Sequence, residues 1–171
     1  MTGSPPRRIS VLIPAHNEEA TIREVVEAAL AHGNRVVVIN DGSDDGTVAR
    51  LEGLPAGILD HADNLGKGTR LAEGLRRAFE DGADNVLTLD ADGQHDPADI
   101  PAFLAAAAPG RIVIGQRTRA EGNMPTHRAL SIGFGDFFIS WATARRMRDC
   151  QCGMRLYPRE ILPCLDMAER D

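Results

Sequence analysis

Short apolar segments that alternate with helical stretches are the feature that most constrains the fold of this chain. Continuous apolar runs of this kind are typical of strands buried on both faces, as in parallel sheets. The stretches between them carry apolar residues at helical spacing, as do Ile22, Val25, Val26 and Ala29. We predict strands at residues 9–14, 35–39, 57–60, 85–89, 111–115 and 153–157. We predict a helix over residues 17–32, a short helix that ends at residue 51, and a helix that begins at residues 64–68 and reaches about residue 80. Two more helices are predicted over residues 97–108 and from residue 158 onward.

This alternation also predicts the class of fold. Strand–helix–strand units spaced in this way form parallel strand pairs with right-handed crossovers. We therefore expect an α/β protein, a three-layer α/β/α sandwich with a mostly parallel central sheet. Residues 1–8 are expected to be a disordered lead-in, and residues 9–171 a single domain large enough for a real core.

Polar residues gather where the predicted strands end. The clusters occupy residues 15–18, 40–45, 90–94 and 116–117, each at the end of an apolar run. In a parallel α/β sheet, ligands bind in the crevice outside the carboxyl ends of the strands. The sequence therefore predicts a working site at this edge of the sheet.

The stretch at residues 87–97 carries the chemistry of this predicted site. Its apolar run ends in two carboxylates, Asp90 and Asp92, which share one face if strand geometry persists that far. Two such charges about 4 Å apart repel by about 4 kcal/mol at an effective dielectric constant of about 20. A cation is expected between them, and a hard divalent ion with oxygen ligands is the natural candidate. Gly93 lets the chain turn, and Pro97 suits the first position of a helix.

Charge and composition exclude several classes of protein. The net charge of −6 argues against a chain that coats nucleic acid, so no nucleic-acid partner is expected. No apolar run reaches the roughly 20 residues that span a bilayer, and the start of the chain lacks the apolar segment of a signal peptide. Three cysteines, an odd number, suit a reducing compartment, where Cys150 and Cys152 are expected to be buried thiols. We expect a cytoplasmic protein, with peripheral contact at the inner membrane face left open.

Five stretches share their pattern with a known family: VLIPAHNEE at 11–19, NDGSDDGT at 40–47, NLGKG at 64–68, DADGQHDP at 90–97 and DCQCGMR at 149–155. Together they make the chain resemble the family 2 glycosyltransferases over roughly residues 9–165. The resemblance implies the GT-A fold and an inverting, metal-dependent enzyme. Within the family, the chain is most similar to the branch related to dolichyl-phosphate mannose synthase. That branch transfers a sugar from a nucleotide to a polyprenyl phosphate.

The resemblance implies a nucleotide site at the strand ends. Asp41 would accept hydrogen bonds from the edge of the base, and Glu18 would accept them from ribose hydroxyls. Lys67 would approach the base or the phosphates. As an alternative, Asn17 and Glu18 would only cap and charge the N-terminus of a helix. The implied nucleotide-binding residues are Pro14, Ala15, Asn17, Glu18, Asp41, Lys67, Asp90, Ala91 and Asp92.

The resemblance also implies a metal site. Asp90 and Asp92, with the neutral oxygen of Gln94, would hold Mg²⁺ or Mn²⁺ against the diphosphate of a sugar nucleotide. The metal would neutralise the leaving diphosphate as the sugar–phosphate bond breaks. The two acids and Arg117 form the implied catalytic set. The alternative is an ordinary acidic turn in which Asp96 caps a helix.

Arginines in the last third of the chain are candidates for binding phosphates, because the guanidinium fork matches phosphate oxygens. Arg117, Arg128 and Arg155 are the predicted contacts to the nucleotide or to an acceptor. Exposed arginines without a specific role are the alternative. Residues 130–148 hold three phenylalanines and the single tryptophan, which suits either a membrane surface near a lipid acceptor or a packed core.

The reaction that the resemblance implies is a single displacement at the anomeric carbon of a GDP- or UDP-sugar, with inversion. A phosphate acceptor is largely ionised at neutral pH and needs no general base, whereas a sugar hydroxyl does. No obvious Glu–Asp pair follows the acids, which favours a polyprenyl phosphate. Family members usually run longer, so part of the acceptor side could be missing. Two alternatives stay open: a non-catalytic nucleotide-sugar-binding protein, and a phosphatase of the haloacid-dehalogenase type, which shares the Asp-x-Asp-Gly motif.

Overall fold

The computed structural model describes residues 8–32, 35–116 and 152–167. The strands within these ranges are β1 (Ile9–Ala15), β2 (Arg35–Asp41), β3 (Gly57–His61), β4 (Asn85–Thr88), β5 (Val113–Ile114) and β6 (Arg155–Pro158). They form one sheet in the order β3-β2-β1-β4-β6-β5. Strands β1 to β4 are parallel, and β6 lies antiparallel between β4 and β5.

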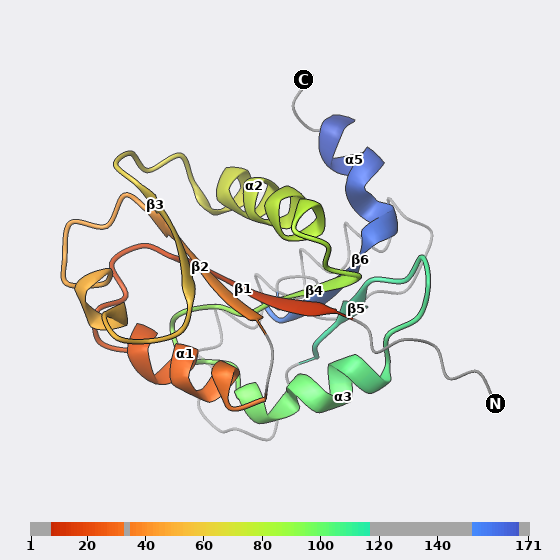
Figure 1. The fold of residues 1–171 in the computed structure, drawn as a ribbon, viewed down its shortest axis with the longest axis horizontal. Helices are drawn as coiled ribbons and strands as arrows, with labels where there is room; N and C mark the ends of the chain where they lie inside the picture. The colour runs from red at the N-terminus through yellow and green to blue at the C-terminus, as the bar shows by residue number, and fades with distance from the viewer. Residues whose placement is uncertain (1–7, 33–34, 117–151, 168–171) are drawn as a thin grey trace, which may run out of the picture.

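Helices cover both faces of this sheet and make three layers (Figure 1). The helices are α1 (Ile22–Leu30), α2 (Lys67–Glu80), α3 (Ile100–Ala105) and α5 (Leu162–Met167), with 3₁₀ turns η1 (Ala49–Leu51), η2 (Pro97–Asp99) and η3 (Arg159–Ile161). Residues of α1 and α3 pack on one face of the sheet, and residues of α2 and α5 pack on the other. The predicted α/β/α sandwich with a mostly parallel sheet is confirmed.

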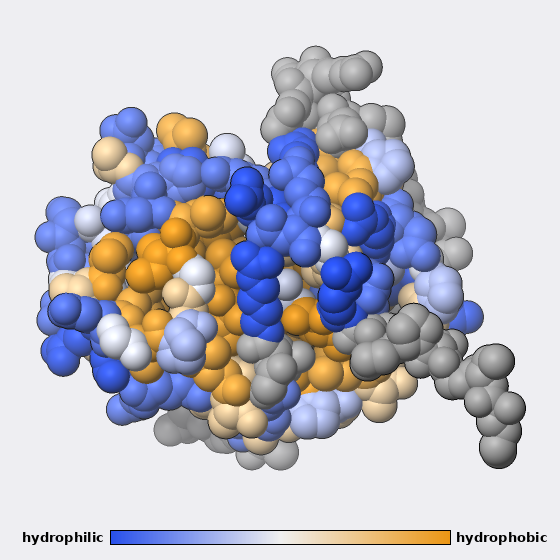
Figure 2. All heavy atoms as spheres, viewed as in Figure 1, coloured by the Kyte–Doolittle hydropathy of each residue, from blue (hydrophilic) through white to orange (hydrophobic). Residues whose placement is uncertain are grey.

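Burial on both faces explains why the strands are continuous apolar runs. Along β1, Val11 and Ile13 pack with the α1 side of the core, while Leu12 packs with the α2 side. All three are fully buried, and burial of each side chain contributes about 1.5–3 kcal/mol. On the surface, hydrophobic residues gather in the middle of the face seen in Figure 2, with hydrophilic residues above and to the left of them.

The first helix begins later than the sequence predicts. Residues 17–21 form a bend and a turn, and α1 begins at Ile22, with Thr21 as an N-cap that makes no side-chain capping bond. Asn17 has a φ of 56°, a left-handed conformation that does not belong to a right-handed helix. The predicted helix start at residue 17 is therefore wrong.

The helix predicted over residues 97–108 is shorter than expected and begins as a 3₁₀ turn. Pro97 opens η2, which leads directly into α3, and α3 ends at Ala105. Asp96 accepts a hydrogen bond from the Ala98 amide at 2.9 Å and caps this turn. The capping role considered for Asp96 is therefore confirmed.

Strand β4 ends before the paired acids. Its pairing with β1 stops at Thr88, and Leu89 adds one last backbone hydrogen bond to β1 at 3.0 Å. Asp90 and Asp92 lie in the loop and turn that follow, so the expectation that strand geometry reaches them is wrong. Gly93, with a φ of 70°, turns the chain as predicted.

Several predicted features lie outside the described residues: Arg117, Arg128, Cys150 and residues 130–148. Arg8, at the end of the predicted lead-in, is described and donates its amide to Asp84 at 2.8 Å. Along the described stretches of the chain, no helix has both the length and the apolar character needed to cross a membrane.

Two glycines of α2 allow a direct test of how this helix packs. A Cβ at Gly74 would lie closer than 3.0 Å to Ile39 and Leu12, whereas a Cβ at Gly68 would meet nothing within 4 Å. We expect Gly74→Ala to lower the free energy of unfolding by about 1–3 kcal/mol through overpacking. Gly68→Ala, the matched control, should leave it unchanged or raise it by up to about 1 kcal/mol, because alanine favours helix. Urea denaturation measures both, and equal effects would contradict the close packing.

Candidate active site

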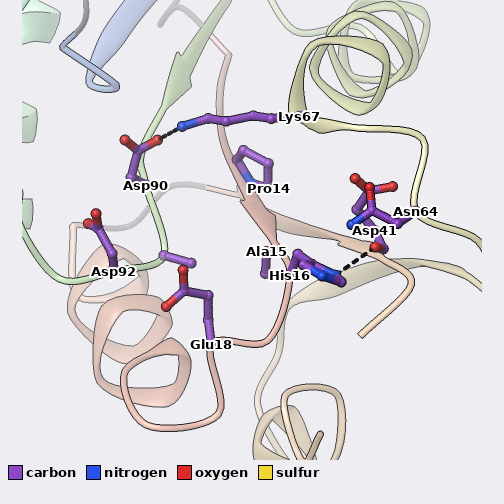
Figure 3. A pocket seen from close by; sticks show the side chains of 10 residues that line it. Pro14, Ala15, His16, Glu18, Asp41, Asn64, Lys67, Asp90 and Asp92 are labelled. Atoms are coloured by element: carbon purple, nitrogen blue, oxygen red, sulfur yellow. Dashed lines mark hydrogen bonds and ion pairs between the residues drawn. The ribbon is translucent and has the colours of Figure 1, made fainter. Parts of the chain in front are cut away.

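A pocket of about 280 Å³ opens where β1, β2 and β4 end and α2 begins (Figure 3). All the predicted nucleotide-binding residues line it except Asn17. His16 and Asn64, which received no role from the sequence although both lie in its motifs, also line it. The lining residues are Pro14, Ala15, His16, Glu18, Asp41, Asn64, Lys67, Asp90, Ala91 and Asp92. The strand ends therefore converge on one pocket.

Asp41 closes one end of this pocket. It is the last residue of β2, and its side chain is buried. Its Oδ1 accepts hydrogen bonds from the Leu65 amide and from Nε of Arg70, and its Oδ2 accepts one from the Gly66 amide, each at 2.9 Å. Burial by itself would raise the pKa of Asp41, but these hydrogen bonds and the charge of Arg70 outweigh it. The pKa of Asp41 therefore lies below its ordinary value.

Arg70 is the buried partner of Asp41, and no motif or pattern in the sequence pointed to it. Its side chain is 7% exposed, and each of its three nitrogens donates a hydrogen bond. Nε donates to Asp41, Nη1 to Glu73 at 3.0 Å and Nη2 to the carbonyl of Asp63 at 2.8 Å. Burial lowers the pKa of Arg70, but the hydrogen bonds and charges of Asp41 and Glu73 reverse this effect and raise the pKa above its ordinary value. A buried pair of this kind fastens α2 to the end of β2.

The loop after β2 is fastened to the loop after β1. Asn17 accepts a hydrogen bond from the Asp44 amide and donates its own amide to the Ser43 hydroxyl, both at 3.0 Å. The Glu18 amide donates to the Thr47 hydroxyl at 2.8 Å. Asn17 therefore binds the loop after β2 and does not line the pocket, whereas Glu18 does line it.

A close backbone approach places Asn64 and His16 at the same end of the pocket as Asp41. Gly42 has a φ of 68°, and a Cβ there would lie 2.8 Å from backbone atoms of Asp63 and Asn64. Only glycine fits both the conformation and the space. The Nδ1 of His16 lies 2.9 Å from the carbonyl oxygen of Asp41 and so joins β1 to β2 beyond their last paired residues.

Asp90 and Asp92 lie at the opposite end of the pocket (Figure 3). Lys67, the first residue of α2, reaches across, and its Nζ lies 2.5 Å from Oδ1 of Asp90. The Nε2 of His95 lies 3.9 Å from Oδ2 of the same carboxylate. Asp92 accepts a hydrogen bond from the amide of Gln94 at 3.0 Å. Asp90 is therefore already paired with a cationic group, while Gln94 is beside the acids without lining the pocket.

The charges around the pocket fit a divalent cation. The lining includes the carboxylates of Glu18, Asp90 and Asp92 against the ammonium of Lys67, while the charge of Asp41 is offset by Arg70 behind the lining. Such a surface would repel a diphosphate unless positive charge were added. Within the described ranges, no three His, Cys, Asp or Glu side chains converge into a ready-made metal site. This donor set fits magnesium-like sites, in which one or two carboxylates share the ion with substrate phosphates.

Arg155 is the one predicted phosphate-binding arginine that falls within the described part of the chain. It is the first residue of β6, and its Nε donates to the carbonyl of Cys152 at 2.7 Å. Cys152 itself is a buried free thiol, as predicted. Arg155 thus binds the loop that leads into its own strand.

The sequence profile described as Glycosyl transferase family 2 matches residues 10–165. The chain therefore belongs to this family, as its motifs predicted, and the phosphatase alternative is excluded. Its structure is similar to that of glucosyl-3-phosphoglycerate synthase from Mycobacterium tuberculosis in complex with Mn²⁺, UDP-glucose and phosphoglyceric acid. The TM-score is 0.72 at 22% identity, and the match covers 92% of this chain and 58% of that one. This similarity confirms the GT-A fold.

Two relatives with higher sequence identity have names that include a polyprenyl phosphate. An undecaprenyl-phosphate 4-deoxy-4-formamido-L-arabinose transferase from Proteus mirabilis is 32% identical, covering 92% of this chain and 51% of that protein. A UDP-N-acetylglucosamine–dolichyl-phosphate N-acetylglucosaminyltransferase from Methanococcus voltae is 29% identical, covering 92% of this chain and 72% of that protein. The chain thus spans about half the length of the first relative and about seven-tenths of the second.

The pair of Asp41 and Arg70 predicts a pH-dependent stability. Because the pKa of Asp41 lies below its ordinary value of about 3.9, its contribution is complete above that pH and is lost as the pH falls through the lowered pKa. We expect Asp41→Asn to lower the free energy of unfolding by about 3 kcal/mol at neutral pH, since the buried Arg70 loses one of its two carboxylate partners and keeps only Glu73. The difference from the wild type should shrink below about pH 4.

Urea denaturation at neutral pH and in acid measures this difference. Asp44 is exposed, and no hydrogen bond or ion pair holds its side chain among the residues that the structure describes, so Asp44→Asn is the control and should change little at either pH. A stability loss for Asp41→Asn that does not depend on pH would contradict the prediction.

Proposed function

We propose that this chain forms the donor side of an inverting glycosyltransferase that transfers a sugar from a nucleotide diphosphate to a polyprenyl phosphate. The observation that carries the proposal is the pocket, with Asp41 at one end and Asp90 and Asp92 at the other. This arrangement suits a ligand with a base at one end and a diphosphate at the other. Membership of the family and the names of the relatives support the same class of reaction.

In this proposal the nucleoside lies along the ends of β1 and β2. Pro14 and Ala15 form the wall beneath it, and Glu18 accepts hydrogen bonds from the ribose hydroxyls. Asp41 faces the edge of the base. Lys67, at the start of α2, offers its ammonium to the phosphates.

The hydrogen bonds already made by Asp41 favour uracil over guanine. A carboxylate has about four lone-pair positions. The Leu65 amide and Arg70 use both positions on Oδ1, and the Gly66 amide uses one on Oδ2. One acceptor position is left, which matches the single N–H of uracil. Guanine presents two adjacent donors and would leave one without a partner.

Asp90 and Asp92 are the proposed protein ligands of Mg²⁺ or Mn²⁺, with Gln94 as a third. When bound, the ion supplies positive charge that neutralises the leaving diphosphate. The two carboxylates fix where that charge lies, because both belong to the loop that follows β4. Lys67 is within reach of the same region and adds a second positive charge.

The acceptor in this proposal is an ionised phosphate, so the protein needs to position it rather than deprotonate it. Arg117, Arg128 and Arg155 are the proposed contacts for that phosphate. A polyprenyl phosphate resides in a membrane, so the proposal places the protein at the cytoplasmic membrane face. The second candidate is a domain that binds a sugar nucleotide without transferring the sugar, and the half-length match to the first relative favours testing it.

Metal-dependent nucleotide binding tests the donor side. We expect Mn²⁺ to strengthen binding of UDP, and we expect Asp92→Asn to reduce that gain by at least about tenfold, the scale on which even indirect contacts to a metal act. Asp96→Asn is the matched control, because Asp96 is exposed and caps η2 outside the pocket. Calorimetric titration of UDP with and without Mn²⁺ gives both constants. Equal affinity in the two conditions would contradict a metal-bridged diphosphate.

Transfer to a short polyprenyl phosphate separates the two candidates. With Mn²⁺ and a radiolabelled UDP-sugar, we expect the chain to convert the polyprenyl phosphate into a labelled lipid. We expect Asp92→Asn to form no labelled lipid. Metal-dependent binding without a labelled lipid would favour the non-catalytic candidate.

The choice of base is tested by competition between nucleotides. We expect UDP to bind at least about tenfold more tightly than GDP, because an unpaired donor on guanine costs about 1–3 kcal/mol. Displacement of a fluorescent UDP analogue by each nucleotide in the presence of Mn²⁺ measures the ratio. Tighter binding of GDP would contradict the assignment of uracil to Asp41.

A further inference from the structure

Gly153 packs directly against the carboxyl group of Asp90. It lies two residues before β6, in the loop that brings the chain beside the end of β4. A Cβ at this position would lie closer than 3.0 Å to Cγ and to both carboxylate oxygens of Asp90. Real Cβ atoms do not approach other atoms so closely. The missing side chain at residue 153 is therefore what leaves room for this carboxylate.

The backbone of Gly153 is held in place and cannot easily retreat. The hydroxyl of Thr88, the last residue of β4, donates to the carbonyl of Gly153 at 2.8 Å and also lies 3.3 Å from the carbonyl of Arg155. Thr88 is 3% exposed, so these hydrogen bonds are shielded from water. Arg155 in turn donates to the carbonyl of Cys152 at 2.7 Å. The loop is thus fastened to the strand that leads to Asp90.

The carboxylate of Asp90 is also confined by charged and polar neighbours. Lys67 lies 2.5 Å from Oδ1 and His95 lies 3.9 Å from Oδ2. Any side chain at residue 153 would push the carboxylate away from the wall that Gly153 provides. Its position relative to Asp92, across the same end of the pocket, would then change (Figure 3).

We propose that Gly153 is a positioning residue for the metal and diphosphate site, acting through Asp90. By having no side chain, it sets the place of one of the two carboxylates that share the divalent cation. This inference rests on the proposed function, since it takes Asp90 as a ligand of that cation. It also gives a physical reason for a glycine in the stretch at residues 149–155.

A double-mutant cycle between Gly153 and Asp90 tests the proposal in the full chain. The readout is the gain in UDP affinity on addition of Mn²⁺, measured by calorimetry for the wild type, Gly153→Ala, Asp90→Ala and the double variant. We expect Gly153→Ala to lose at least about tenfold of this gain, the usual effect of disturbing a residue that orients a metal ligand. Its affinity for UDP without metal should stay within about twofold of the wild type. In the double variant, Gly153→Ala should cause no further loss beyond that of Asp90→Ala.

A second readout keeps the test informative where Gly153→Ala folds poorly. Because the added methyl group collides with the Asp90 side chain, the thermal midpoint of Gly153→Ala should fall, and Asp90→Ala should restore it. Gly74→Ala is the matched control, since it crowds the core away from the pocket. It should lower the thermal midpoint but keep the full gain from Mn²⁺.

The outcomes separate the two proposals. If Asp90→Ala keeps the gain from Mn²⁺, the proposed metal site fails, whatever Gly153→Ala does. If Asp90→Ala loses the gain but Gly153→Ala keeps it, the metal site stands and the role of Gly153 is overturned. An equal fall in thermal midpoint for Gly153→Ala with and without Asp90 would also overturn it, because the collision would then lie elsewhere.

Discussion

The ion pair between Asp41 and Arg70 is the interaction on which one end of the pocket depends. It joins the end of β2 to α2 across a buried contact of 2.9 Å. The same carboxylate binds the amides of Leu65 and Gly66, so it also fixes the loop from which Lys67 begins α2. Because a buried charge without its partner is costly, this pair constrains two elements at once.

The carboxylates at the two ends of the pocket thus differ in their charged and hydrogen-bonded neighbours. Asp41 is neutralised within the protein by Arg70, whereas Asp90 meets the exposed ammonium of Lys67 and Asp92 has the amide of Gln94. The carboxylate at the first end therefore offers a limited number of acceptor positions. The second end keeps more net negative charge, which suits the divalent cation that we propose there.

Much of this arrangement was predictable because it follows from local patterns. The apolar runs mark strands buried on both faces, and the residues directly after them line the pocket. Predictions failed where a boundary depended on tertiary contacts. Asn17 leaves helical geometry because its side chain and amide bind the loop after β2. The strand before Asp90 stops where its partner β1 no longer pairs with it.

The sequence by itself determined the α/β class, the polar strand ends and the paired acids, since each is a short-range pattern of residue types. Only the tertiary structure decided that Arg70 neutralises Asp41 and that Gly153 makes room for Asp90. Each of these contacts joins residues far apart in the chain. The contact with Gly153 exists because β6 enters the sheet antiparallel beside β4, an order that no local periodicity encodes. The sequence around a glycine or an arginine does not show which distant residue it will contact, because that depends on the order of the strands in the sheet.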